Sequence, residues 1–212
     1  MSLKTMPRHR KEVGESTGRA EGNEKLTAMT GAILLVLLAA EGVTILRVHQ
    51  LLTLHFFIGM LLIGPVLLKM SSTGYRFVRY YTGSLPYVRK GPPVLLLRLL
   101  GPVIIALSVG VIGSGVALAV VGPGHSLWLL LHKATFVLWF GAMAIHVLWY
   151  APRLPRLLSA GAPGRDRMRV ALAGAGKRWL LLTAALAVGL VIALATYHLA
   201  GSWSGFTGHF GG

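Results

Sequence analysis

The chain has 212 residues, of which 54% are hydrophobic and only 13% are charged. This composition is too apolar for a water-soluble domain of that length, and a lipid bilayer supplies the second solvent that it needs. The net charge of +15 would suggest nucleic acid as the partner of a soluble protein, but the basic residues here lie between apolar segments, where they set orientation. Nucleic-acid binding is therefore excluded. Because the chain has no cysteine, iron–sulfur clusters, disulfides, thiolate zinc sites and covalently attached c-type haem are excluded as well.

Five segments meet the requirement of about 20 apolar residues per helical span. They predict an all-α, polytopic membrane protein whose transmembrane helices lie at about 27–46, 51–68, 94–121, 128–150 and 179–199. Residues 1–26 are expected to form a basic tail that is not cleaved from the first span. The helical bundle then covers 27–200, with polar connections at 70–93 and 152–178, and residues 201–212 form a glycine-rich tail.

The basic residues predict which way the chain crosses the membrane. Six Lys and Arg precede the first span, six lie at 69–98 and seven at 153–178, which leaves only Arg47 and Lys133 at the other side. Since positively charged loops stay in the cytoplasm, the N-terminus is predicted to be cytoplasmic and the C-terminus extracytoplasmic. We expect a multi-pass protein of the plasma membrane.

Ionisable side chains within a span are costly to bury and are functional candidates for that reason. His55 and His132 are each the fifth residue of spans that run in the same direction, so both are expected at one level near the outer leaflet. His146 follows His132 by fourteen residues, nearly four turns, which puts it on the same helix face about 21 Å further along the axis. Histidines placed in this way suit the axial ligation of haem b between the helices of a bundle.

The segments that carry these histidines resemble bacterial b-type cytochromes that anchor oxidoreductases in the membrane. They are LHFFIG at 54–59, LHK at 131–133 and AIH at 144–146, and the segment STGYRFVRYY at 72–81 is similar to uncharacterised actinobacterial membrane proteins of this kind. The wider group is the cytochrome b and ferric-reductase-like transmembrane superfamily. The resemblance covers the four later helices, and it implies a four-helix haem-binding bundle that takes part in electron transport.

One position departs from the two-haem pattern of that superfamily. The residue fourteen after His55 is Lys69, where a ligand facing His146 would be expected. Met70 is the nearest alternative axial ligand, although it also suits ordinary packing. One haem b, held by His55 and His132, is therefore the prediction, with a second haem at His146 as the open alternative.

Several further residues have both a cofactor-binding and a plainer interpretation. Lys133 at the outer site, and Arg76 and Arg79 at the inner one, would neutralise haem propionates, whereas arginines at a cytoplasmic interface are also expected from orientation alone. Gly59, one turn from His55, would admit a porphyrin. Glu41 is either a proton relay or the partner of Arg47 or of a histidine. His49 and His198 are weaker candidates for the ligand role.

These observations favour a membrane subunit that exchanges electrons with a quinone or with a separate redox protein. Such a subunit needs only to hold its cofactor in an apolar bundle, and the substrate chemistry would belong to a partner, so whether the chain itself is an enzyme stays open. Two alternatives come from other classes: a small transporter or metal-handling protein with Glu41 and the outer histidines as its ion site, and a structural membrane subunit without a cofactor.

Overall fold

The computed structural model describes residues 8–89, 91, 94–153 and 174–203, and within those ranges the chain is helical with no strand. The long helices are α1 (Arg8–Leu46), α2 (Val48–Tyr81), α4 (Leu95–Val121), α5 (Ser126–Tyr150) and α8 (Ala175–Thr196). Shorter elements are α3 (Leu85–Val88) and the 3-10 turns η1 (Ala151–Arg153) and η2 (Tyr197–Trp203). Within the described ranges, five helices are long and apolar enough to cross a membrane, which confirms the all-α, multi-pass prediction.

Two helices are longer than the sequence predicted. α1 begins at Arg8, directly after Pro7, because the basic segment from there to Thr27 contains good helix formers and no further proline. α2 does not stop near Leu68 but continues to Tyr81, so the first half of the expected polar connection is helical. It ends at a turn where Gly83 has φ +75°, a left-handed conformation that glycine adopts without strain. Of the second expected connection, residues 154–173 lie outside the described part of the chain.

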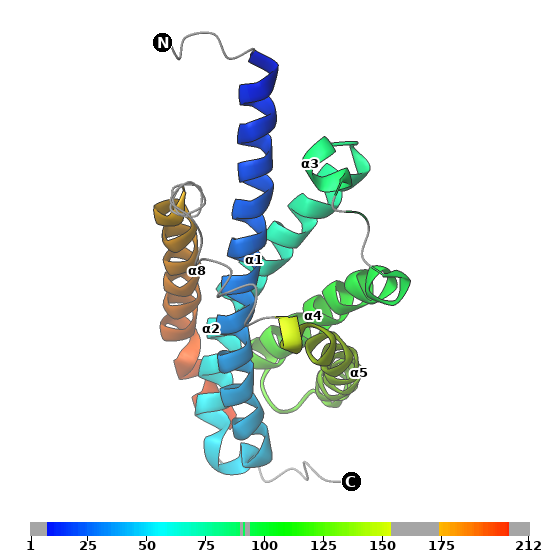
Figure 1. Cartoon of the computed structure of the whole chain (residues 1–212). Helices are drawn as coiled ribbons and strands as arrows, with labels where there is room; N and C mark the ends of the chain where they lie inside the picture. Colours follow the sequence, from blue (N-terminus) through cyan, green and yellow to red (C-terminus); the bar gives the residue numbers. More distant parts are fainter. Residues whose placement is uncertain (1–7, 90, 92–93, 154–173, 204–212) are drawn as a thin grey trace.

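α2 is the central helix of one group. It follows α1 after a single non-helical residue, Arg47, and packs between α1 and α8 (Figure 1). The α1–α2 seam is filled by Leu34, Ile58 and Leu62. On its other side α2 crosses α8 closely, since a Cβ added to Gly64 would lie 2.0 Å from the backbone oxygen of Ala185.

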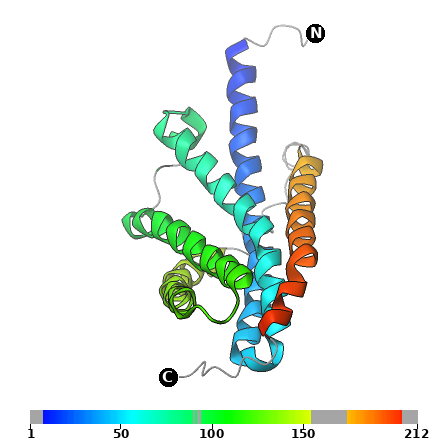
Figure 2. The ribbon, with the colours of Figure 1, turned by 180° about the vertical axis from the view of Figure 1, so that it is seen from behind.

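α4 and α5 form a second group, a helical hairpin whose main packing partners are each other. Figures 1 and 2 both show this pair to one side of the α1–α2–α8 group and inclined to it. The two groups meet through contacts of α4 with α2 and with η2. The candidate site described below lies at this junction.

Candidate functional site

His55 on α2 is held by two residues of α1. Its Nδ1 lies 2.9 Å from Glu41 Oε1 and 3.0 Å from the Thr44 hydroxyl oxygen. The Thr44 hydroxyl donates its own proton to the Glu41 backbone oxygen at 2.6 Å, so both groups accept from the imidazole. Nδ1 is therefore the donor, and in the neutral form of this imidazole the lone pair lies on Nε2.

His132 on α5 is held in the same way by α4. Its Nδ1 lies 3.0 Å from the Val111 carbonyl oxygen, which can only accept. The Ser114 hydroxyl is 3.2 Å from the same nitrogen and donates to the Gly110 carbonyl at 2.7 Å. The proton of His132 is thus also on Nδ1, and its Nε2 is the nitrogen with the free lone pair.

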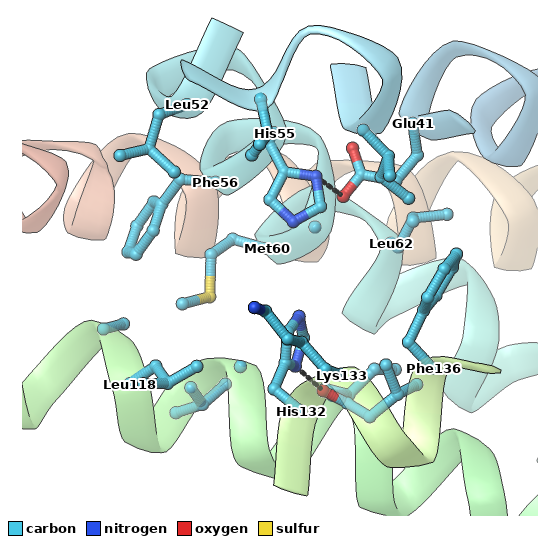
Figure 3. Close-up of a pocket in the computed structure, with 18 of the residues that line it drawn as sticks. Glu41, Leu52, His55, Phe56, Met60, Leu62, Leu118, His132, Lys133 and Phe136 are labelled. Carbon is cyan, nitrogen blue, oxygen red and sulfur yellow. Dashed lines mark hydrogen bonds and ion pairs between the residues drawn. The ribbon is translucent and has the colours of Figure 1, made fainter. Parts of the chain in front are cut away.

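The two imidazoles lie opposite each other, as their equal depth in the sequence predicted. Their ring centroids are 6.4 Å apart with an angle of 75° between the planes. In Figure 3 the second nitrogen of each ring is on the side that faces the other ring. Two lone pairs directed at one space repel each other unless a proton or a metal ion lies between them.

An apolar cavity of about 390 Å³ surrounds the facing histidines, a volume within the range of small-molecule and cofactor sites. It is lined from α1, α2, α4, α5 and η2, so α1 and not only the four later helices contributes to the site. Apart from the two histidines, Lys133 is the basic residue among the described residues that line the cavity. Its side chain extends beside His132 (Figure 3). Phe56 and Phe136 provide aromatic walls.

Glu41 and Gly59 are both at this cavity, and the structure settles what Glu41 contacts. Its carboxylate pairs with His55, one of the partners considered from the sequence. Gly59 also lines the cavity, and a Cβ there would lie 3.5 Å from Glu41 Oε1, an ordinary contact distance. His49 and His198 are exposed and do not line the cavity.

Four residues of the site were missed by the sequence analysis: Thr44, Val111, Ser114 and Gly115. In the sequence, Gly110, Gly113 and Ser114 make one side of the span at 94–121 small, a pattern that suits either a porphyrin or the close approach of helices. Gly110 does contact Thr135 of α5, but Ser114 holds His132, and Gly115 borders the His132 ring. The cluster of small residues on α4 was the signal that the sequence offered for this part of the site. Which residue of α5 the cluster contacts is set by the packing of the hairpin.

The inner residues lie away from this cavity. His146 lies beside Tyr150, with ring centroids 4.9 Å apart and an angle of 47° between the planes, and it interacts electrostatically with Lys69. The Lys69 ammonium donates to the Thr27 backbone oxygen at 2.6 Å and so is directed to α1. Met70 is half-buried on α2. An inner ligand pair of His146 and Met70 stays a prediction.

The two arginines proposed for propionates are not near the outer pair either. Arg76 and Arg79 are exposed, more than five turns after His55 on the same helix. Among the residues that the structure describes, no three His, Asp or Glu side chains gather as a site for a bare metal ion. The chemistry available at the cavity is therefore that of two imidazole donors, one carboxylate partner and one nearby lysine.

Comparison of the chain with models of known protein families, with curated proteins and with solved structures gives no match.

Proposed function

We propose that this chain is a membrane b-type cytochrome, which binds one haem b between His55 and His132 and carries electrons between a quinone or a separate redox protein and a second carrier. The observation that carries the proposal is the pair of facing Nε2 atoms in an apolar cavity. A metal ion about 2.0 Å from each imidazole nitrogen would hold the two ring centroids on the order of 6 Å apart. The observed separation of 6.4 Å fits this arrangement.

The ligand set suits haem better than it suits a bare ion. A structural or catalytic zinc ion takes three or four protein ligands, whereas a porphyrin brings four nitrogens and leaves two axial positions for the protein. Two histidines whose Nδ1 protons are held by a carboxylate, a hydroxyl or a carbonyl are typical of metal ligands, because such partners fix the tautomer and the ring orientation. When bound, the haem supplies one-electron oxidation and reduction of its iron.

The other residues of the site have roles that follow from their positions. Glu41 and Thr44 orient His55, while Val111 and Ser114 orient His132. The ammonium group of Lys133 is suited to balance the charge of haem carboxylates. The apolar wall of the cavity excludes water, and that exclusion is one of the factors that set a haem potential.

A visible spectrum of the detergent-purified protein tests the proposal. We expect the absorption of a low-spin, non-covalent haem b with about one haem per chain, extracted by acidic organic solvent. His55→Ala and His132→Ala should each remove most of the bound haem, because each leaves the iron with one imidazole. His198→Ala is the matched control, since that histidine is exposed and away from the cavity.

The same measurement separates the proposal from its alternatives. A wild-type protein that contains no haem after expression with ample haem supply would overturn the cytochrome assignment and leave the metal-handling and structural hypotheses. A haem content of two per chain that falls to one in His146→Ala and in Met70→Ala would instead support the second, inner site.

A further inference from the structure

α4 contacts the His132 ring at Gly115, a residue without a side chain. A Cβ built on Gly115 would lie 3.0 Å from Cε1 of His132, 3.4 Å from its Nδ1 and 4.0 Å from its Nε2. The imidazole therefore lies against the bare backbone of α4 at residue 115. A carbon–carbon separation of 3.0 Å is well inside the usual contact distance of about 3.5–4.0 Å, so any side chain there would displace the ring.

The displacement would move Nε2, the nitrogen of His132 that is proposed to bind the iron. Cε1 is bonded to Nε2, so a force on Cε1 moves the free nitrogen by a similar amount. The ring also cannot simply swing away, because Nδ1 is held on the same helix by the Val111 carbonyl at 3.0 Å and by Ser114 at 3.2 Å. A methyl group at residue 115 would require the ring to give by a few tenths of an ångström, a displacement comparable to the spread of about 0.2 Å expected for a metal–ligand distance.

We infer that Gly115 is a positioning residue, whose lack of a side chain sets the orientation of His132 for axial ligation. The inference rests on the proposed function and deepens it, since it assigns the geometry of one ligand to a residue of the facing helix. The residue acts through His132 and has no ligand atom of its own. It forms, with Val111 and Ser114, a slot on α4 that admits the imidazole in one orientation.

Two other glycines of α4 provide matched controls. A Cβ on Gly113 meets nothing within 4 Å, so Gly113→Ala repeats the chemical change and its gain in helix propensity without a new contact. A Cβ on Gly110 would lie 3.1 Å from Cγ2 of Thr135. Gly110→Ala therefore introduces a similarly tight contact between α4 and α5, but that contact does not involve an imidazole. Together they separate ring displacement from general disturbance of the hairpin.

The experiment compares the spin state and the haem content of the purified full-length variants. Gly115→Ala is expected to lower haem affinity by about ten- to a hundredfold, the usual effect of a lost orienting contact. The haem that remains bound should show a raised high-spin fraction in its visible and electron paramagnetic resonance spectra. Gly113→Ala and Gly110→Ala should keep the low-spin spectrum of the wild type.

Three outcomes bear on the inference. A low-spin wild type with an unchanged spectrum in Gly115→Ala would overturn it while leaving the proposed function intact. An equal high-spin fraction in Gly110→Ala would also overturn it, because hairpin packing and not the imidazole slot would then be responsible. If Gly115→Ala reduces the yield of folded protein, the spin state per bound haem of the monodisperse fraction still decides the question.

Discussion

The two histidines of the site differ in the group that accepts their Nδ1 protons. His55 faces the carboxylate of Glu41, whereas His132 faces the neutral carbonyl of Val111. A carboxylate partner makes an imidazole a stronger electron donor than a carbonyl partner does. If both histidines bind the proposed haem, the two ligands would therefore be inequivalent, and Glu41 would be the residue that makes them so.

Replacing Glu41 by Gln tests this difference. The amide keeps a hydrogen-bond acceptor near Nδ1 but removes the negative charge, so the oxidised iron loses more stabilisation than the reduced iron and the midpoint potential rises. A tenfold change in the relative affinity for the two oxidation states corresponds to about 59 mV for one electron. Redox titration of the purified protein measures the shift.

Glu21→Gln serves as the control for that titration. It makes the same change on the same helix, at an exposed position about 30 Å from Glu41 by the rise of an α-helix. Its potential should equal that of the wild type. A potential that stays constant or falls in Glu41→Gln would show that the carboxylate does not act on the His55 ligand.

The residues of the site differ in how far the sequence could reveal them. His55 and His132 could be paired because their depth in two parallel spans depends only on helix rise. Thr44 and Gly115 could not, because each meets its histidine across a contact between two helices. The rotation of one helix against the next is set by side-chain packing, which a single sequence does not display.

At the scale of the elements, α2 and α8 cross with their backbones close together. A Cβ on Gly189 would lie 2.1 Å from the Leu61 backbone oxygen, just as one on Gly64 would meet Ala185. Small residues allow such backbone approach between membrane helices, where packing replaces the hydrophobic effect as the driving force. Gly189 is 125 residues after Gly64 in the chain, and no pattern in the sequence pairs the two glycines.

Gly189→Ala is expected to destabilise the protein by about 1–3 kcal/mol, the usual range for overpacking. The obstacle is backbone and not a flexible side chain, so the two helices must move apart. The temperature at which the detergent-solubilised protein loses its monodisperse elution peak measures the effect. Gly176→Ala on the same helix meets nothing within 4 Å and should leave that temperature unchanged or slightly raised; equal losses in both variants would contradict the packing argument.

The sequence predicted which segments form helices better than it predicted where those helices end. Apolar length locates a span, but it does not say where the helix stops once the chain leaves the apolar layer. α2 illustrates this, because its 34 residues would extend about 51 Å, well beyond a hydrocarbon core of about 30 Å. The helix ends instead just before Gly83, where the chain turns with a positive φ.

For the whole molecule, the positive-inside rule predicts that the end of α2 and the start of α8 face the cytoplasm. A reporter that is active only outside the cytoplasm should therefore work when fused after Gly212 and fail when inserted between Gly161 and Gly164. Both fusion points lie outside the described residues. The opposite pattern of reporter activity would invert the topology.

The division of the fold into two helix groups gives a second prediction at this scale. His55 belongs to the α1–α2–α8 group and His132 to the α4–α5 hairpin, so a cofactor bound by both would join the groups. Hydrogen exchange in α4 and α5 should be faster in haem-free protein than in haem-loaded protein, because a ligand stabilises only the state that binds it.

α8 provides the internal control for that comparison, since it packs mainly on α2 and none of its described residues lines the cavity. Its exchange rates should change little on loading. Equal slowing of all helices would indicate that the cofactor stabilises the fold as one body, contrary to this prediction.

The depth of the histidine pair has a consequence for energy conversion. His55 is the fifth residue of the span predicted to begin at Leu51, about 6 Å into a hydrocarbon core of about 30 Å. If the proposed haem lies at this level, an electron that enters the site from the face of the α1–α2 turn would cross roughly one fifth of the membrane's electric field. At a full-crossing energy of about 2.3 kcal/mol per 100 mV, this step would couple to the membrane voltage by only about 0.5 kcal/mol per 100 mV, so exchange with a partner on that face would depend far less on the membrane voltage than a full crossing would.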